Sequence, residues 1–573
     1  MKNKEKIEYY FTDNEIIKIL CKKRAIEAKK VHDNHFLRNI TKGAFNPNTN
    51  YQREIYNFFP PRNEWIRLTR EERIKRNTNA FELNKIQLFR TVTRERKRLI
   101  NSKGEIPKWL LNLNKFISDI KSAALDTNLN YIIPKPTIKP ILKSKDPNEY
   151  RPICIYKLFD LIIIGQISKY LTYCFDPLFL DCSYAFRSDN NSKKSFNHHE
   201  VILDILKYKE KMKCNLYVSE CDIKKFYDCV NHCVIIEVFK NFVNRAKLDL
   251  DITIDIRAII IFSKYLDSFS FNKDVEKNEN KLLKNINVSD GFISKVKKEE
   301  LLVIGSNSDL DNLGIPQGGA LSCLIANMIL DYVDRKVIES TDNKQFYARY
   351  CDDMLIMHPI KDECTKLFAI YQNSLRDIKL ISHKPKTFLK YGKEFWTKDL
   401  KSKEPYLWSQ VSENNLSVPW LSFVGYQIRN DGLIRVRKFS IEKEIKKLVN
   451  ETDNLLKVLK KRKKLNLSTK AISFRLKQRF ISMSVSRVSL NNRNISMCWC
   501  AGFKVLKQKN NIGSQFKILD KNRERQLKRL ENHLKKYKST YRKSTPNGKT
   551  IGLKYYGPKF SYFNQFQKKR NER

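Results

Sequence analysis

The chain has 573 residues, 41% of them hydrophobic, with 33 Phe and 26 Tyr; this excludes an intrinsically disordered protein, because disordered chains are poor in aromatic residues. Lys and Arg number 111 against 62 Asp plus Glu, a net charge of +49. Such an excess attracts polyanions, of which nucleic acid is the commonest. No window approaches the ~20 apolar residues of a membrane span, and the 13 cysteines form no CxxC zinc pattern. We therefore expect a cytoplasmic protein with reduced thiols and no membrane contact.

The positive charge is concentrated toward the end of the chain. Residues 431–573 carry 39 Lys plus Arg against 9 Asp plus Glu, which is +30 of the total +49. An A+T-rich genome would explain an excess of Lys over Arg, but it would not explain the scarcity of acidic residues. We expect this segment to be the main polyanion-binding surface.

The first half of the chain divides into a helical and a mixed region. Residues 1–130 have the charged, helically spaced pattern of an extension, and no chemistry is visible there. Pro134, Pro136, Pro140 and Pro152 exclude long helices and predict extended strands. A buried helix is expected over 156–175, followed by a strand that ends at Asp222. Residues 234–312 are polar and are typical of an insertion that carries helices.

The second half contains the clearest local patterns. The segment "GIPQGGALSCLIANMILDYVDRKV" predicts a glycine-containing loop that leads into a helix, and "YARYCDDMLIM" predicts two short strands with two aspartates at their turn. The segment "LSFVGYQIRNDGLIRVR" predicts a hairpin with its turn at 430–432. After Phe439 basic residues at helical spacing dominate.

Three carboxylates carry the chemistry that the pattern suggests. Asp222 ends a strand, and Asp352 with Asp353 occupies a hairpin turn, so the three side chains would converge if those strands were neighbours in one sheet. Carboxylate oxygens suit Mg²⁺, which takes one or two protein carboxylates plus substrate phosphates. Most adjacent aspartate pairs are simply solvated turn residues, but the apolar flanks of this pair argue against that alternative.

The order of these segments resembles the reverse transcriptase family. "RYCDD" is similar to the signature of tyrosine, any residue and two aspartates; "CDIKKFYDCVNH" and "GIPQGGALSCLIANMILDYVD" resemble the catalytic block and loop-helix block that precede it. "RPICI", "SYAFRS", "SHKPKTF" and "LSFVGYQI" also match in order. The resemblance covers roughly residues 130–440 and is strongest to the bacterial group that includes intron-encoded, retron and defence-associated enzymes.

The resemblance implies roles for the carboxylates and for a lysine. Asp222, Asp352 and Asp353 would bind two Mg²⁺ ions, with Mn²⁺ as an alternative ion, and the backbone carbonyl of Ile223 would be an additional ligand. Lys386 falls at the position proposed to protonate the departing pyrophosphate, although Lys384 lies close enough to take its place.

The resemblance also implies a nucleotide-binding site, whose expected members come from three segments. An aromatic ring at Tyr227 would select deoxynucleotides by clashing with a 2′-hydroxyl; the alternative is a core tyrosine. Arg151 and Lys135 would contact the triphosphate, although Lys135 has an equal claim to be a solvated lysine. Gln317 and Gly318 would lie against the nascent base pair.

The family implies an α+β right-hand polymerase with fingers, a ferredoxin-like palm and a helical thumb. We accordingly predict a helical N-terminal extension over 1–130, fingers and palm over 131–438 with an insertion at about 234–312, and a basic helical thumb with a C-terminal extension over 439–573. The implied partners are dNTPs, a template or noncoding RNA and a DNA product.

The chain lacks the cysteine pairs of a C-terminal nuclease and the Asn-Ala-x-x-His and Val-Thr-Gly blocks of retron enzymes. Its long spacer, its N-terminal extension and its tail "KYYGPKFSYF" are most similar to the unknown-group and abortive-infection-like reverse transcriptases of antiphage defence. A group II intron maturase, a retron-type enzyme and a non-catalytic RNA-binding module stay open as alternatives. The template, the priming mode and the oligomeric state are also left open.

Overall fold

The structure is a computed structural model. It describes the following residues: 2–41, 54–76, 80–101, 105–126, 130–143, 148–187, 196–293, 295–303, 305–306, 310–340, 344–385, 388, 390–391, 395, 400–410, 416–460, 468–485 and 512–537. The chain forms two compact units, one from Met1–Ile19 with Ile106–Trp420, the other from Leu20–Glu105 with Leu421–Arg573. This division differs from the predicted boundaries at 130 and 438, which stay predictions.

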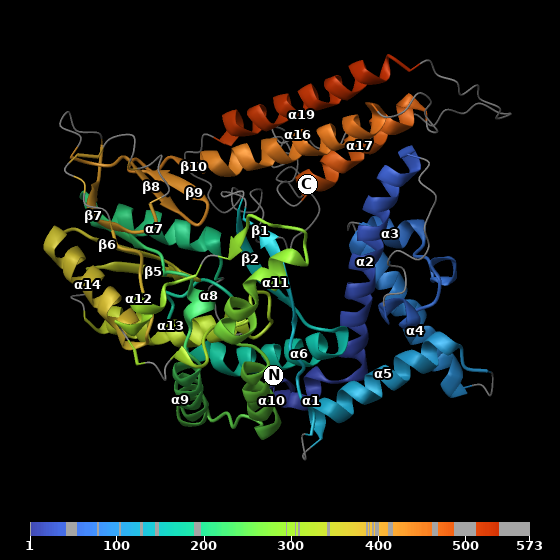
Figure 1. The fold of residues 1–573 in the computed structure, drawn as a ribbon, viewed down its shortest axis with the longest axis horizontal. Coiled ribbons are helices and arrows are strands. Elements are labelled where there is room, and N and C mark those ends of the chain that lie inside the picture. Colours follow the sequence, from blue (N-terminus) through green and yellow to red (C-terminus); the bar gives the residue numbers. More distant parts are fainter. Residues whose placement is uncertain are drawn as a thin grey trace. The chain divides into compact units, whose positions relative to one another are not determined.

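The first unit combines helices with two sheets (Figure 1). Its strands are β1 (Thr137–Leu142), β2 (Glu149–Ile155), β3 (Leu216–Cys221), β4 (Phe292–Ile293), β5 (Phe346–Tyr350), β6 (Asp353–His358) and β7 (Lys403–Trp408). Its helices are α1 (Ile7–Tyr10), α5 (Lys108–Leu125), α6 (Leu158–Phe175), α7 (His198–Met212), α8 (Phe226–Cys229), α9 (His232–Leu250), α10 (Ile256–Asp267), α11 (Glu279–Lys284), α12 (Lys298–Leu302), α13 (Ser322–Glu339) and α14 (Lys361–Asp377). Short 3-10 or π turns are η1 (Lys2–Glu5), η4 (Asp176–Leu178), η5 (Phe271–Val275) and η6 (Glu276–Asn278).

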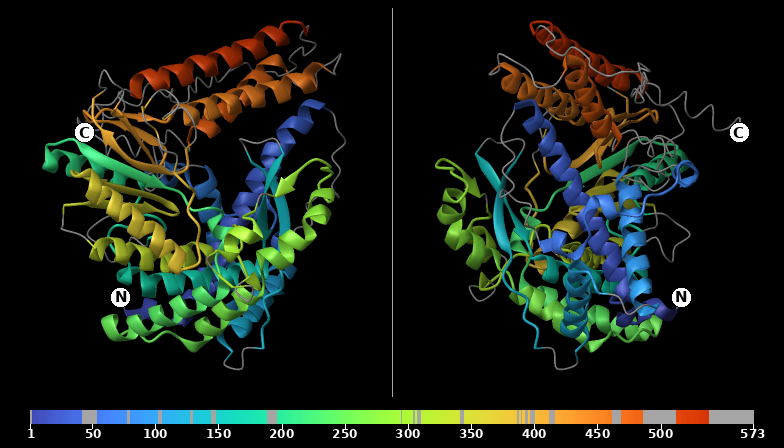
Figure 2. Two further views of the ribbon diagram at one scale, coloured as in Figure 1. Left: turned by 60° about the vertical axis from the view of Figure 1, so that its left-hand side comes forward. Right: turned by 90° about the vertical axis from the view of Figure 1, so that its right-hand side faces the viewer.

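A four-stranded antiparallel sheet with the order β5-β6-β3-β7 lies between two helical layers (Figure 2). Successive side chains of a strand point to opposite faces, and β5 shows this directly. Phe346 packs against Tyr208 of α7, with ring centroids 5.4 Å apart, whereas its neighbour Tyr347 donates a hydrogen bond to Asp334 of α13. Helix α7 therefore covers one face, and α13 with α14 covers the other.

The second sheet of this unit has the order β1-β2-β4. Strands β1 and β2 form an antiparallel hairpin in which Pro140 lies opposite Pro152. The backbone bond from Lys143 N to Glu149 O, 2.8 Å long, marks a hydrogen-bonded pair, and such pairs alternate along a ladder. The proline pair therefore falls at a position where no N–H bond crosses between the strands, which explains how two prolines are tolerated. The insertion supplies β4, which pairs in parallel with the start of β2.

The expected buried helix is α6, whose apolar residues lie in the core. By length and composition alone Leu158–Leu178 could cross a membrane, but 67% of that apolar window is buried inside the protein. Burial of this kind is the ordinary property of a core helix in a globular protein.

The second unit contains most of α2 (Asp13–Thr41), η2 (Glu54–Phe58), η3 (Arg62–Glu64), α3 (Arg70–Arg76), α4 (Ala80–Asn101), the β10-β9-β8 sheet and three long helices. The strands are β8 (Trp420–Phe423), β9 (Tyr426–Arg429) and β10 (Ile434–Val436); the helices are α16 (Lys438–Lys460), α17 (Thr469–Val485) and α19 (Ile512–Leu534). Strands β9 and β10 form the predicted hairpin.

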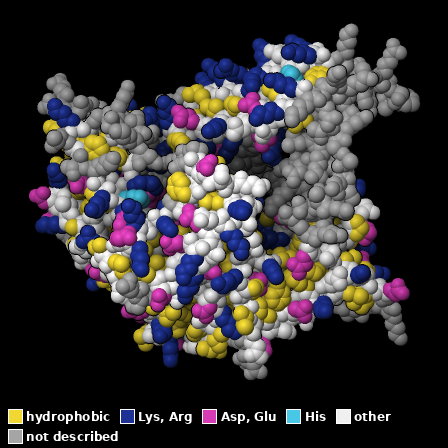
Figure 3. Space-filling model, in the orientation of Figure 1, with side chains coloured by type: hydrophobic (Ala, Val, Ile, Leu, Met, Phe, Trp, Pro, Cys, Tyr) yellow, Lys and Arg dark blue, Asp and Glu magenta, His cyan; other side chains and the backbone are white. Residues whose placement is uncertain are grey.

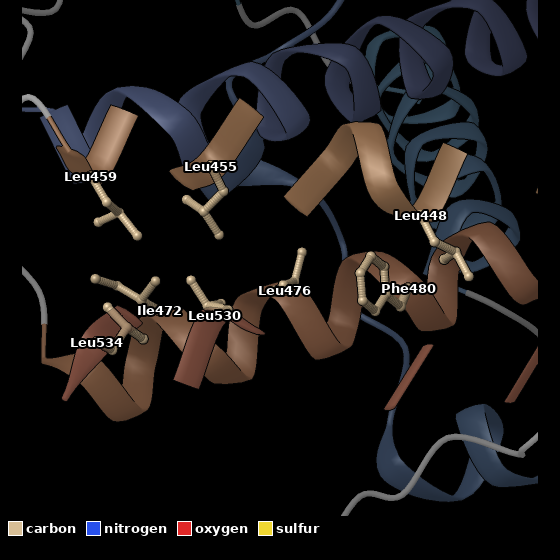
Figure 4. Close-up of a cluster of buried hydrophobic side chains, with 8 residues drawn as sticks. All are labelled: Leu448, Leu455, Leu459, Ile472, Leu476, Phe480, Leu530 and Leu534. Atoms are coloured by element: carbon tan, nitrogen blue, oxygen red, sulfur yellow. The ribbon is translucent and has the colours of Figure 1, made fainter. Parts of the chain in front are cut away.

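The three long helices share a hydrophobic core, drawn in Figure 4. Leucines at three- to seven-residue spacing on α16, and residues four apart on α17, form the apolar stripes that helices bury against each other. The buried residues of the cluster are Leu448, Leu455, Leu459, Ile472, Leu476, Phe480, Leu530 and Leu534. The helix-rich pattern predicted after Phe439 is therefore present over the described residues.

Candidate active site

Asp222 and the Asp352–Asp353 pair come from adjacent strands of the four-stranded sheet, as their spacing predicted. Strands β3 and β6 are its central neighbours, and Cys221 lies opposite Met354. One residue beyond this last pair, the same register would set Asp222 opposite Asp353. Because Met354 lies on the face covered by α13 and α14, alternation places Asp222 and Asp353 on the opposite face.

The hairpin between β5 and β6 turns in only two residues. Tyr350 pairs with Asp353, so Cys351 and Asp352 form the turn, and Cys351 has a φ of +59°. A two-residue hairpin turn favours positive φ at its first position, but a side chain other than glycine costs roughly 1 kcal/mol or more there. The strained turn is the one that carries Asp352, and strain of this kind is found at functional sites.

A buried arginine, Arg349, holds this turn in place through hydrogen bonds. The Arg349 side chain, which is 0% exposed, forms an ion pair through Nη2 with Asp334 of α13 at 2.6 Å. The same nitrogen donates to Ser183, and Nη1 donates to Asn327. It also donates a hydrogen bond of 3.1 Å to the carbonyl oxygen of Cys351. The strained turn is thus fixed to α13 by a network in which one guanidinium satisfies several groups at once.

The two innermost carboxylates interact electrostatically. Burial raises the pKa of Asp352, and the negative charge of Asp222 raises it further, while Lys401 and Arg151 act in the opposite direction. Lys401, whose side chain is 53% exposed, forms an ion pair with the nearly buried carboxylate of Asp222. Its ammonium therefore occupies the position of a cation beside Asp222. Two nearby carboxylates that disfavour their joint ionisation form a site that attracts positive charge.

The donor set fits a divalent cation that is completed by substrate oxygens. No group of three or more His, Cys, Asp or Glu side chains that could hold a metal ion by itself occurs among the described residues. Mg²⁺, however, needs only one or two protein carboxylates beside phosphates and water, and Asp222 with Asp352 supplies two. Ile223 lies opposite Ser382 in an antiparallel bridge, and the hydrogen bonds of this bridge are made by the residues on either side of the pair. The carbonyl of Ile223 therefore points away from the segment around Ser382.

The glycine-containing loop before α13 packs against the same region. Gly314 has a φ of +84°, and a Cβ there would lie 3.0 Å from the carbonyl oxygen of Asp228. Further along the loop, the Gln317 carbonyl accepts a 2.9 Å bond from Cys154 N of β2, and its side-chain amide donates to the Asp228 carboxylate at 2.7 Å. Gly318 follows with a φ of +96°. The predicted loop thus bridges strand β2 and helix α8.

Tyr227 lies on α8, beside both the loop and the turn. Its carbonyl accepts a 2.8 Å bond from Ile315 N. Burial raises the pKa of its phenol, and Cys323, Cys351 and Asp352 raise it further. The half-buried ring is therefore close to Asp352, which is compatible with the predicted contact to a nucleotide sugar.

Several basic side chains gather near Asp228. Burial raises the pKa of Asp228, which Gln317, Lys225, Lys143 and Arg151 act to lower. Arg151 is exposed on β2 and acts on both Asp228 and Asp352, so the structure brings this predicted residue near the carboxylates. Lys143 and Lys225 were missed by the sequence reasoning, although the basic residues on both sides of the β1–β2 turn were a usable signal.

Other predicted residues have a different standing. Lys135 is 70% exposed and forms an ion pair with Asp274 of η5 at 2.6 Å, so its triphosphate role stays a prediction. Lys386 lies outside the described residues. Asp353 is exposed at the start of β6. Sequence reasoning also missed Lys401, because nothing in its local pattern pointed to Asp222, which is 179 residues away.

Breaking the ion pair between Arg349 and Asp334 should strongly reduce the stability of the protein. In the Asp334→Ala variant the guanidinium of Arg349 would stay buried without a counter-charge, so we expect the free energy of unfolding to fall by about 3–5 kcal/mol. Urea unfolding, with hydrogen exchange of the β5 amides as a local readout, measures this. The control is Asp377→Ala, which removes an exposed carboxylate; a loss below about 1 kcal/mol in Asp334→Ala would contradict the role of the pair.

The buried carboxyl of Asp228 predicts a pH-dependent stability. Burial raises its pKa from 3.8 to about 6, so between pH 4 and 6 the folded state holds a proton that the unfolded state has lost. Stability therefore falls as the pH rises through this window. Asn keeps the oxygen that accepts from Gln317, so Asp228→Asn should be more stable than the wild type above pH 6, by up to about 3 kcal/mol.

Urea unfolding of both proteins between pH 5 and 7.5 tests this prediction. The stability gap should shrink as the pH falls. A gap that is the same at every pH would show that the charge of Asp228 is not its cause.

Comparisons with known proteins add to this geometry. A family model described as reverse transcriptase (RNA-dependent DNA polymerase) matches residues 296–428, and no curated protein matches the chain. The similar solved structures include Candida albicans telomerase in complex with a TWJ fragment of telomeric RNA, with 12% identity, coverage of 81% of this chain and 71% of that chain, and a TM-score of 0.32. Apo telomerase from Candida tropicalis matches with 12% identity, coverages of 81% and 77%, and a TM-score of 0.33.

The family match covers the loop before α13, the hairpin that carries Asp352 and Asp353, and strands β7 to β9. Reverse transcriptase domains generally use divalent metal ions, which agrees with the carboxylate pair found at the hairpin. The segment 296–428 is therefore a reverse transcriptase domain, and the chain is an RNA-directed DNA polymerase, a nucleotidyltransferase.

Proposed function

We propose that this polymerase synthesises DNA from dNTPs by two-metal nucleotidyl transfer centred on Asp222 and Asp352. The observation that carries the proposal is the electrostatic coupling of these two carboxylates at the ends of adjacent strands. Asp353 and the carbonyl of Ile223 are the additional ligands. Two divalent ions at such a site stabilise the attacking and leaving oxygens of phosphoryl transfer.

The chain's own residues have separate tasks in this mechanism. The rigid β3–β6 pair holds the carboxylates at a fixed separation, and positioning of this kind is the main contribution of a protein to phosphoryl transfer. Lys401 neutralises Asp222 while no substrate is bound, and a divalent cation held by Asp222 and Asp352 would take the place of its ammonium. Lys386, or Lys384 beside it, donates the proton to the leaving pyrophosphate.

The nucleotide is held between α8, β2 and the loop before α13. Tyr227 excludes a 2′-hydroxyl, and Arg151 contacts the triphosphate, for which a guanidinium is well suited. Gln317, oriented by its hydrogen bond to Asp228, lies with Gly318 against the nascent base pair. Lys135 is a further contact of the triphosphate on this proposal.

The right-hand architecture assigns the elements as follows: the β5-β6-β3-β7 sheet with α13 and α14 is the palm, the β1-β2-β4 sheet is the fingers, and residues 439–573 form the thumb. Helix α19 supports the thumb assignment, because exposed basic residues follow one of its faces at spacings of three and four (Figure 3). These are Lys517, Lys521, Arg525 and Lys528. A basic stripe of this kind binds phosphates without reading the sequence.

We further propose a biological role in bacterial antiphage defence. This role rests on the sequence resemblance to the unknown-group and abortive-infection-like enzymes, and the partner proposed from that resemblance is a structured noncoding RNA. In this role the enzyme works in the cytoplasm, and its DNA product impairs phage growth.

The Asp352→Ala variant tests both the mechanism and the role. It removes one of the two coupled carboxylates, so dNTP incorporation on an RNA template should fall by at least about 10³-fold, and chelation of divalent ions should abolish wild-type incorporation. In cells, phage plaque counts should rise to those of an empty vector. The control is Asp362→Ala, an exposed acid in the first turn of α14. Equal incorporation by Asp352→Ala and wild type would refute the mechanism, and equal plaque counts with and without the wild-type gene would refute the role.

Replacing Tyr227 should relax sugar selection. In Tyr227→Ala the clash with a 2′-hydroxyl is lost, so the ratio of kcat/KM for dNTP over rNTP should fall by about tenfold or more. Single-nucleotide incorporation kinetics measure this ratio. The control Tyr332→Ala, which removes a tyrosine bonded to exposed Asp377, should leave it unchanged. An unchanged ratio in Tyr227→Ala would assign the ring to the core instead.

A further inference from the structure

Three cationic side chains converge beside the catalytic turn, and they come from three segments of the chain. Lys143 directly follows β1, Arg151 lies on β2, and Lys225 lies in the segment that follows Asp222. All three act electrostatically on the buried carboxyl of Asp228, which places them around one point. Lys225 is held there with a φ of +47°, a conformation that residues other than glycine adopt only under constraint.

Glu149 lies in the middle of these cations. Its Oε1 atom accepts a hydrogen bond from Lys225 Nζ at 2.8 Å and another from Lys143 Nζ. The Glu149 side chain is only 17% exposed, and it precedes Arg151 by two residues on the same strand, so both side chains project from the same face of the sheet. One carboxylate oxygen therefore receives two ammonium groups, which is the arrangement expected of a phosphate oxygen.

The crowding of the two lysines shows why an anion is needed there. Burial lowers the pKa of Lys143, and the neighbouring charge of Lys225 lowers it further, while Glu149 raises it. Without an anion, two ammonium groups in contact and partly buried would repel each other. The position therefore requires a negative charge at all times, from the protein or from a ligand.

We propose that Glu149 is an internal substitute for the nucleotide triphosphate, which holds Lys143 and Lys225 in place until the phosphates displace its carboxylate. Glu149 is a positioning residue, because it acts through the lysines and not on the reacting atoms. This inference rests on the proposed function of the site. A triphosphate carries more negative charge than one carboxylate and therefore displaces it, whereas a ligand of low charge does not.

The competition has a measurable consequence for ligand affinity. In Glu149→Gln the internal anion is gone, so the ligand no longer competes for the lysines, and inorganic tripolyphosphate should bind about three- to tenfold more tightly than to the wild type. Glu149→Asp keeps the competing charge and should bind like the wild type. Lys225→Met removes a ligand contact and should bind more weakly. Isothermal titration of the full chain with tripolyphosphate measures all four proteins.

A matched control comes from the insertion, outside the lysine cluster. Glu276 is a surface carboxylate that pairs with Lys295 at 2.7 Å, so Glu276→Gln removes the same charge from the chain without touching the cluster and should bind tripolyphosphate like the wild type. If it gained as much affinity as Glu149→Gln, the effect would come from net charge alone, and the proposal would be overturned.

Steady-state incorporation separates the substitute role from a structural one. Glu149→Gln should lower the KM for dNTP by a similar factor and leave kcat within about twofold, because Glu149 competes for the lysines and does not touch the reacting atoms. Equal or weaker tripolyphosphate binding by Glu149→Gln would overturn the proposal and leave the polymerase mechanism intact. Failure of the wild type to incorporate dNTPs would refute the mechanism instead, while the tripolyphosphate affinities would still report on Glu149.

Discussion

The active-site geometry depends on one buried charge. Arg349 is enclosed between the four-stranded sheet and α13, and its guanidinium joins Asp334, Asn327 and the carbonyl of Cys351. A buried ion pair is weak evidence for added stability, because desolvation offsets much of the attraction. Its value here is geometric. A planar guanidinium with fixed donors locks the turn to the helix, and this is what a strained turn needs if its carboxylate is to stay in one place.

The carboxylates around the site differ in how deeply they are buried and in how their charges are neutralised. Asp334 is neutralised by Arg349 in the core, Asp228 is buried beside Gln317, and Asp222 and Asp352 face outward, where cations can reach them. Burial and the nearby charge of Asp222 both raise the pKa of Asp352. Asp222 and Asp352 differ from Asp334 in that neither has a buried cation as a permanent partner, so the chemistry falls on these two carboxylates. Lys401, which is half-exposed, is a partner that can leave at little cost, because exposed ion pairs contribute little to stability.

Much of the fold and of the site could be predicted from sequence, for identifiable reasons. The strand before Asp222 and the hairpin around Asp352 followed from local apolar patterns, whereas the expectation that the two aspartates share one site came from the resemblance to reverse transcriptases. The β4 strand and the Lys401 ion pair could not be predicted in this way, because the first is a two-residue pairing and the second joins residues that are far apart in sequence. Tertiary partners of this kind depend on the whole fold. The place of Lys143 beside Glu149 likewise depends on the register of β1 and β2, which no local pattern gives.

The proline pair of the β1–β2 hairpin also has a consequence for how the molecule meets other chains. In a non-hydrogen-bonded pair each backbone nitrogen points away from the partner strand, so Pro140 removes a donor from the free edge of β1, and Pro152 removes one from β2 beyond the reach of β4. The hairpin exposes Ile141 and Ile155, and an open strand with such side chains would otherwise be a template for adding a foreign strand. The two prolines interrupt that template on both sides. The sheet can therefore present an apolar surface to a ligand with less risk of polymerising with its own copies.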